Sequence, residues 1–541
     1  AVTTGVQNTI IGALAGDALT DSGPVVAVGY EALSTEDRDG GGTTAIGYQA
    51  LKTQNAGATA YNTAVGWNAG LSVTTGIQNT LFGALAGDAL TDADHNVAIG
   101  MEALTTDTLG SRSTAIGYNA LAAQNFTTAT NADNVAVGYL AGYAVTTGIR
   151  NTLIGTNAGD ALTVGVQNVA LGREALGADT KGNNSVAIGN SALRVQNFTT
   201  ATDAFNTAVG DQAGIAVTTG LRNTLIGGFS GDALTDADYN VAVGSHSLSS
   251  DTLGSKSTAL GYTALFSQNF TTATDSFNVA VGYETGVSLT TGTKNTFVGS
   301  LAGDGTDDGA HNTAVGYQAL SVNCGDSNTA LGFQAGASIT GGKNTMIGDR
   351  AGDATTSGGG NVIIGTTCDA SAADTSNSIV MGEGAAGVGA NNFTFGNGGT
   401  DSNIAFGATS ITAPSDERYK EEITTSTAGL SFINDLRPVT FKWRKEKDVP
   451  SDHPTYVEGS DKRVMESNGE INHGFIAQEV KAVIDNHSEI KDGFNMWSEQ
   501  GLDKDGNSTG GRQRLGDGAL VPILVKAIQE LTARIKTLED G

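Results

Sequence analysis

Near residue 415 the chain carries a serine and a lysine whose types and spacing could perform peptide-bond chemistry. Ser415 follows Pro414 and stands five positions before Lys420. A serine hydroxyl is a weak nucleophile unless a neighbour takes its proton, and a lysine takes it only when burial or positive charge lowers its pKa from about 10.4. Five positions on a helix turn side chains about 500° apart, so Ser415 must precede the helix that carries Lys420. Taken alone, the motif favours a helix N-cap at Ser415, beside Asp416 and Glu417.

The elements that must position these residues begin where the composition changes, at Pro414. Glycine becomes rare there, and charged and long aliphatic residues appear. We expect a short helix over 429–438 that ends at a proline, an alternating strand over 439–444, a polar loop over 446–470 and a helix after His473. A lone histidine such as His473 is more often structural than catalytic.

The last helix, over about 519–540, carries a heptad pattern. Apolar residues spaced 3-4-3-4-3 form a seam for association with other helices: Val521, Leu524, Ile528, Leu531, Ile535 and Leu538. The seam is shorter than three heptads, so we expect the rest of the assembly to decide the number of chains.

The first four hundred residues repeat one short phrase. Asn-Thr-Ala-Val-Gly stands at 62–66, 206–210 and 312–316, and its variants end at glycines that are mostly 17 residues apart. A 21-residue step recurs three times, so that Gly66, Gly138, Gly210 and Gly282 are 72 residues apart. Such periods are typical of solenoids.

Each repeat is too short to enclose a wide core, which indicates a flattened roll. We expect two short strands per coil, coils stacked in parallel, and an asparagine at a recurrent turn whose side chains bond along the stack. The predicted fold class is mainly β: a parallel β-roll or β-solenoid array over 1–412, followed by an α+β domain over 413–541.

The repeated phrase resembles the head repeats of trimeric autotransporter adhesins, which form parallel β-rolls that trimerise. The repeats here are longer than that family's usual ones. A single-chain β-helix is the structural alternative. The first nine residues resemble 144–152, so we expect a longer protein whose attachment region precedes residue 1.

Composition excludes several classes of function. The net charge is −27, and 21 of these charges belong to the array, which has 33 acidic and 12 basic residues. We therefore expect no nucleic-acid partner. No apolar run is long enough for membrane insertion, and two cysteines make neither a disulfide framework nor a metal cluster. We expect no cofactor and no metal.

Two features of the array leave alternatives open. Aromatic residues such as Tyr48, Trp67, Tyr118 and Tyr139 follow the repeat glycines, and they either stack on a glycan or pack between coils and subunits. The acidic phrase at 87–94 and 231–238 is either a calcium site or a solvated acidic turn.

The tail resembles the C-terminal intramolecular chaperone domain of phage endosialidases, tailspikes and tail fibres. The matching phrases are Ser-Asp-Glu-Arg-x-Lys at 415–420, Leu-Arg-Pro at 436–438 with Phe-x-Trp at 441–443, His-Gly-Phe-Ile-Ala-Gln-Glu at 473–479, and the last helix. The resemblance implies trimerisation, assisted folding of the preceding fibre and self-cleavage by a serine–lysine pair. It implies Ser415 as nucleophile, Lys420 as base, His473 as a functional histidine and Pro414–Ser415 as the scissile bond.

The sequence therefore predicts a homotrimeric phage tail fibre or receptor-binding appendage, made in the host cytoplasm and carried on the virion. Its partners are expected to be a host-surface glycan or protein receptor and other tail proteins, bound through the region before residue 1. The only enzymatic activity expected is one self-cleavage per chain. The alternatives are a bacterial trimeric adhesin head and a glycan-degrading tailspike.

Overall fold

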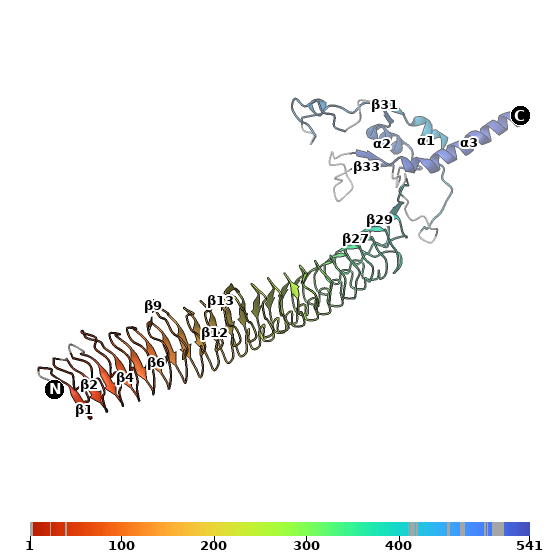
Figure 1. Cartoon of the computed structure of the whole chain (residues 1–541). Helices are drawn as coiled ribbons and strands as arrows, with labels where there is room; N and C mark the ends of the chain where they lie inside the picture. Colours follow the sequence, from red (N-terminus) through yellow and green to blue (C-terminus); the bar gives the residue numbers. More distant parts are fainter. Residues whose placement is uncertain are drawn as a thin grey trace. The chain divides into compact units, whose positions relative to one another are not determined.

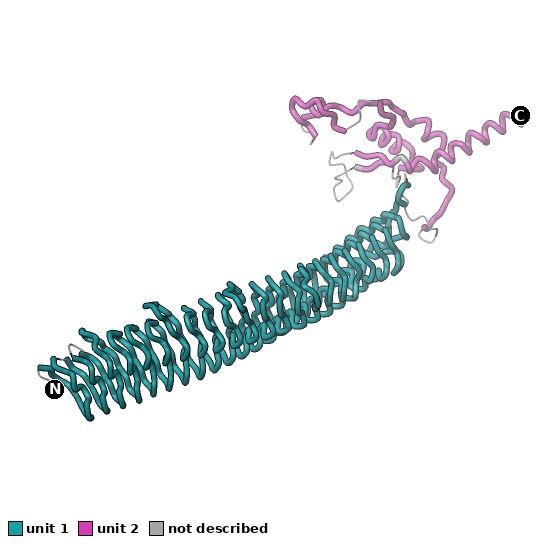
Figure 2. Tube along the Cα trace, viewed as in Figure 1, with its two compact units in different colours: residues 1–414 teal, residues 415–541 magenta. Residues whose placement is uncertain are grey.

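The computed structural model describes the chain apart from residues 1–3, 22, 38–40, 409–410, 412–416, 418–419, 452–454, 466–470, 492–493, 495 and 500–512. The chain divides into two compact units, Ala1–Pro414 and Ser415–Gly541 (Figure 2). None of the helices within the described residues is long and apolar enough to cross a membrane.

The first unit, the array, is a parallel β-solenoid in which successive coils add short strands to one 24-stranded sheet (Figure 1). The strands pair in exact register, so that Ala115 lies opposite Ala98 on one side and Ala136 on the other. The mainly β parallel solenoid predicted from the repeats is confirmed. The strands of this sheet are β1 (Thr9–Ile11), β2 (Val26–Val28), β3 (Thr44–Ile46), β4 (Thr63–Val65), β5 (Thr80–Phe82), β6 (Val97–Ile99), β8 (Thr114–Ile116), β10 (Val135–Val137), β11 (Thr152–Ile154), β12 (Val169–Leu171), β14 (Val186–Ile188), β16 (Thr207–Val209), β17 (Thr224–Ile226), β18 (Val241–Val243), β20 (Thr258–Leu260), β22 (Val279–Val281), β23 (Thr296–Val298), β24 (Thr313–Val315), β25 (Thr329–Leu331), β26 (Thr345–Ile347), β27 (Val362–Ile364), β28 (Ile379–Gly382), β29 (Asn392–Gly396) and β30 (Ser402–Ala405).

The expectation of two strands in every coil is wrong. The stretch after each repeat glycine forms a turn, in which Asn119 and Leu121 both have left-handed backbone angles (φ 54° and 51°). Residues in that conformation cannot extend into a strand. Among the described residues, a second pair of strands forms only beside the 21-residue steps: β7 (Gly110–Ser111) with β9 (Thr130–Asn131), β13 (Gly182–Asn183) with β15 (Thr202–Asp203), and β19 (Gly254–Ser255) with β21 (Thr274–Asp275).

The core of the array is a thin column of small and aliphatic side chains. From β2 to β27, the middle residue of each strand of the 24-stranded sheet is buried, usually as alanine. A coil such as 114–121 adds Ala120 and Leu121 from the turn. Where the middle residue is larger, the turns beside it carry glycine. A Cβ added at Gly142 or Gly159 would lie 2.8 Å from a methyl group of Leu153. Core volume is thus kept nearly constant along the array.

The repeat glycine is required by coil stacking. Gly117 has φ +135°, and a Cβ placed on it would lie 2.2 Å from the carbonyl oxygen of Gly138 in the next coil. A side chain at this position would force the coils apart, which explains why the phrase always ends in glycine.

The predicted asparagine stack is confirmed. Asn79 donates its backbone N–H to Oδ1 of Asn62 at 2.8 Å, and its Nδ2 donates to the carbonyl of Ala93 at 2.8 Å. Both asparagines are fully buried. Each carboxamide therefore links its own coil to the next one and satisfies backbone groups that the turn leaves unpaired.

The second unit is a small α+β domain. Its elements are α1 (Leu430–Asp435), β31 (Val439–Phe441), the 3-10 helix η2 (Glu446–Asp448), β32 (Asn472–Gly474), α2 (Ala477–Asn486), β33 (Trp497–Glu499), β34 (Gln513–Leu515), the 3-10 helix η3 (Asp517–Ala519) and α3 (Leu520–Asp540). Strands β31 and β32 pair antiparallel, as do β33 and β34. The core contains Phe432 of α1, Val480 and Ile484 of α2, and Leu520 and Ile523 of α3.

Candidate functional site in the C-terminal unit

Helix α1 is held at both ends by polar side chains from later parts of the chain. At its start, the backbone N–H of Leu430 donates to Oε2 of Glu530 on α3 at 3.0 Å. A Cβ on Gly429 would lie 2.7 Å from that carboxylate, so the approach requires glycine. A carboxylate at a helix N-terminus compensates the positive end of the helix dipole. This contact ties α1 to α3 across a hundred residues.

At the other end of α1, Asp435 contacts a buried histidine. His487 follows α2, and its Nε2 lies 2.9 Å from Oδ2 of Asp435, while its Nδ1 lies 2.9 Å from Oε1 of Glu489. The ring packs edge-on against Phe432. Hydrogen bonds to the carboxylates of Glu489 and Asp435 raise the pKa of His487. The imidazole ring therefore links α1 to the residues that follow α2.

Sequence reasoning missed His487, because its partner Asp435 lies 52 residues earlier. The local signal was the second carboxylate, Glu489, two residues after the histidine. It also missed the ion pair of Arg437 with Glu479, in which Nε donates to Oε2 at 2.9 Å. Glu479 belongs to the phrase at 473–479 and Arg437 to the phrase at 436–438. The two phrases thus meet in space and fix the hairpin against α2.

Only two residues of the predicted self-cleavage site, Lys420 and His473, are among the described residues. His473 is on β32 opposite Thr440 of β31, and its side chain is exposed. The Lys420 side chain is exposed as well. Pro414 and Ser415 lie outside the described residues. The described part of the chain therefore presents Lys420 and His473 at the surface, and the pairing of Ser415 with Lys420 stays a prediction.

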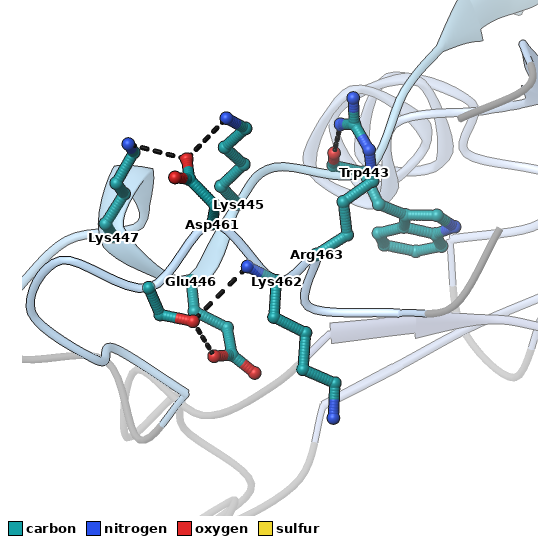
Figure 3. Close-up of polar contacts among 8 residues, drawn as sticks. Trp443, Lys445, Glu446, Lys447, Asp461, Lys462 and Arg463 are labelled. Carbon is teal, nitrogen blue, oxygen red and sulfur yellow. Dashed lines mark hydrogen bonds and ion pairs between the residues drawn. The ribbon is translucent and has the colours of Figure 1, made fainter. Parts of the chain in front are cut away.

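A basic and apolar region follows β31. A pocket of about 800 Å³ is lined by residues that include Trp443, Val464, Ile476, Lys442 and Arg444. Figure 3 shows how the loop beside it is fixed: Asp461 contacts Nζ of Lys445 at 2.5 Å and of Lys447 at 2.7 Å.

Two further contacts in Figure 3 hold the same loop, since Arg463 donates to the backbone carbonyl of Trp443 and Ser460 donates to Glu446 at 2.7 Å. The two lysines lower the pKa of Asp461 to about 2. The predicted polar loop is thus an ordered arm over its described residues.

Comparison with known proteins identifies this unit. Residues 415–489 match the family model described as chaperone of endosialidase. The match begins at Ser415 and ends at Glu489, so it includes α1, the β31–β32 hairpin, α2 and the His487 contacts. The C-terminal unit therefore contains a chaperone-of-endosialidase domain over residues 415–489, and the resemblance inferred from the tail is confirmed. Searches of curated proteins and of solved structures found no match to the chain.

Helix α3, which continues the chaperone domain, has one buried and one exposed apolar face. Leu520, Ile523 and Ala527 are buried against the core. The six seam residues, Val521, Leu524, Ile528, Leu531, Ile535 and Leu538, are 42% to 83% exposed. The seam is thus available for another helix.

In the array, the aromatic residues singled out from the sequence form short stacks. Tyr48 stacks on Trp67 with ring centroids 6.3 Å apart, and Tyr118 stacks on Tyr139 at 5.5 Å. Each ring is 40% to 52% exposed. Because the rings face one another along the array, they present mainly their edges and end faces to solvent.

The acidic phrase at 87–94 bonds neighbouring coils. Asp88 accepts a hydrogen bond from Thr105, Asp92 from Thr75, and Asp94 from the backbone N–H of Ile77. The described residues contain no group of three or more His, Cys, Asp or Glu side chains arranged to hold a metal ion.

The 21-residue steps build a buried polar junction. Gln124 donates to Asp107 Oδ2 at 2.5 Å and to Ser113 at 3.0 Å, and Asn134 donates to Gln124 at 2.9 Å. All four side chains are fully buried. The same junction recurs 72 residues later at Gln196. These inserts therefore connect coils within the array.

Proposed function

We propose that the protein is a homotrimeric phage tail fibre or receptor-binding appendage whose C-terminal unit assembles the trimer and then cleaves itself off. One observation carries the proposal: a chaperone-of-endosialidase domain directly follows a long parallel β-solenoid. Parallel solenoid pairing is slow to form and exposes strand edges while incomplete. A C-terminal clamp that holds three chains together raises their effective concentration during this step.

The clamp is formed by α3 in this proposal. Three copies of the seam from Val521 to Leu538 bury the apolar side chains that a single chain leaves exposed. The Glu530 contact to α1 transmits the position of α3 to the rest of the domain.

Self-cleavage is assigned to the bond between Pro414 and Ser415. Ser415 Oγ attacks the carbonyl carbon of Pro414 while neutral Lys420 takes its proton. The amide nitrogen of Ser415 then leaves as an amine after receiving that proton, which gives an ester. Water hydrolyses the ester, releasing a carboxylate at Pro414 and restoring the hydroxyl. His473 either orients these groups or supports the hairpin.

The mature fibre is proposed to reside on the virion, after synthesis in the host cytoplasm. Its array is the part that faces a host-surface glycan or protein, and other tail proteins are its further proposed partners. The stacked Tyr48–Trp67 and Tyr118–Tyr139 pairs are candidate glycan contacts, because their ring edges and end faces are exposed.

The intact mass of the purified full chain tests the catalytic assignment. We expect two fragments, one ending at Pro414 and one beginning at Ser415. Ser415→Ala and Lys420→Met should leave the chain uncut, whereas the neighbouring exposed Ser426→Ala should be cut normally. An uncut wild-type trimer would leave the tail as a folding clamp without protease function. An uncut monomer would overturn both roles.

A further inference from the structure

The outer face of the array sheet is uncharged and carries a continuous row of apolar side chains. Each three-residue strand from β1 to β27 has Ile, Val, Leu or Phe as its third residue and Thr or Val as its first. The middle residue points into the core, so the first and third point outward. We call these two columns of side chains the outer sheet face.

The columns are unbroken because the strands pair in register. Ile116 lies beside Ile99 in one neighbouring coil and beside Val137 in the other. The third residues remain accessible to solvent: Phe82 is 56% exposed, Leu331 47% and Ile226 38%. Single exposed aliphatic residues are ordinary on a protein surface, whereas an unbroken row of them is not.

Charge is absent from this face. The array holds 33 acidic and 12 basic residues, yet no strand of the 24-stranded sheet from β1 to β27 contains a charged residue. Asp203 and Asp275 lie in strands of the separate pairs β13–β15 and β19–β21. In a chain this acidic, a solvated surface is expected to carry carboxylates, as the turns of the array do. Interface centres are depleted of charged residues in the same way.

The size of the outer sheet face matches a protein interface. About twenty strands spaced about 4.8 Å apart extend for about 100 Å, and three residues of strand are about 10 Å wide. The face, made of threonine and apolar side chains, therefore covers about 1,000 Å². It is comparable to the roughly 800 Å² that each partner contributes to a stable complex.

We propose that the outer sheet face is where the arrays of identical chains pack against one another. A partner must present an uncharged surface about 100 Å long with the same spacing along its axis, and a second copy of this chain has one. Parallel, in-register packing sets like coils side by side and brings no carboxylates into the contact. The inference rests on the proposed assembly of three chains and adds a second interface, separate from the α3 seam.

Cysteine cross-linking of the full chain tests the face directly. Ile226→Cys and Leu171→Cys place thiols on the outer sheet face, and Val164→Cys and Val195→Cys place them on turns with matched exposure, 37% and 38% against 38% and 41%. Both native cysteines, Cys324 and Cys368, are buried. A short bis-maleimide is added to each variant, and the products are separated under denaturing conditions.

We expect Ile226→Cys and Leu171→Cys to give covalent dimers and trimers, and the turn variants to remain single chains. Light scattering of the same samples distinguishes failure of the proposed sheet contact from failure of trimer assembly. Trimers that cross-link equally well from turns and sheet, or not at all from the sheet, would overturn the face while leaving assembly intact. A monomeric wild type would overturn the assembly itself.

A charge test complements the cross-linking. The double variant Leu171→Glu with Ile226→Glu adds two carboxylates to the outer sheet face, and Val164→Glu with Val195→Glu adds two to the turns. We expect only the first pair to lower the melting temperature of the trimer, and to do so more steeply at low salt, where carboxylates repel more strongly. Equal melting temperatures for the two pairs would contradict the proposed contact.

Discussion

The backbone N–H of Asn168 donates to Oδ1 of Asn151 at 3.0 Å, and Nδ2 of Asn151 donates to the carbonyl of Gly165 at 2.9 Å. One buried carboxamide therefore satisfies a donor and an acceptor of the next coil. The same relationship recurs along the array, which makes each asparagine a connection between coils rather than a turn residue alone.

Asn151→Ala should destabilise the array strongly. The substitution leaves the N–H of Asn168 and the carbonyl of Gly165 buried without a partner, at a cost of about 2–4 kcal/mol. Urea unfolding of the array measures the change. Asn131→Ala, at an exposed position, removes the same carboxamide from the surface and should change stability by less than about 0.5 kcal/mol. Equal losses would show that the buried carboxamide has no special role.

Repetition is what made the array predictable. One phrase, Asn-Thr-Ala-Val-Gly, meets the same surroundings in each coil, so its alternation, its glycine and its asparagine could be interpreted together. The turn after the glycine was mispredicted as a strand because Leu121 and the leucines at equivalent positions adopt left-handed backbone angles that leucine does not signal. Tertiary packing imposes these angles against local preference.

In the tail, the sequence located α1 and the strand after it because Pro438 ends one and alternation marks the other. It could not locate the contacts at the two ends of α1, because Glu530 and His487 reach Leu430 and Asp435 from distant parts of the chain. The geometry at Ser415 lies outside the described residues, so the serine–lysine pair depends on the resemblance and on the family match.

Gly117→Ala should prevent normal coil stacking. The added Cβ would lie 2.2 Å from the carbonyl oxygen of Gly138, and the backbone angle of +135° is unfavourable for any side chain. Gly57→Ala is the matched control, since Gly57 also has a positive φ, +64°, but nothing lies within 4 Å of its Cβ. We expect about 1–2 kcal/mol of strain for the control and a far larger loss for Gly117→Ala, measured by thermal unfolding. Similar losses would attribute the requirement to backbone angle alone.

The chaperone domain should lose stability as the pH rises above neutrality. Glu489 and Asp435 raise the pKa of His487 above its unfolded value, so folding favours the protonated ring. This stabilisation is fully present below the unfolded pKa of about 6.5 and is lost as the pH rises through the folded pKa. At pH 6 we expect His487→Gln to lower the free energy of unfolding by about 1–2 kcal/mol. This loss is smaller than for a fully buried ion pair because Asp435 is largely exposed.

Tryptophan fluorescence can follow this unfolding. In an uncut Ser415→Ala chain with Trp67→Phe, the remaining tryptophans, Trp443 and Trp497, both belong to the C-terminal unit. His487→Gln should abolish most of the stability difference between pH 6 and pH 9. His311→Gln, an exposed histidine of the array, should preserve it. A difference that survives in His487→Gln would assign the pH dependence to another group.

The α3 seam should control the number of chains before cleavage. Ile528 is 61% exposed and lies in the centre of the predicted seam. Ile528→Asp places a carboxylate there in each of three chains. These carboxylates would repel one another, and they would keep their hydration only if the helices separated. In the uncut Ser415→Ala chain we expect this change to shift the species seen by light scattering from trimer to monomer at micromolar concentration. Gln529→Asp adds the same charge at the adjacent exposed position and should remain trimeric, because that position points away from the seam. A trimer that tolerates Ile528→Asp as well as Gln529→Asp would show that α3 does not hold the chains together, and that assembly depends on the array alone.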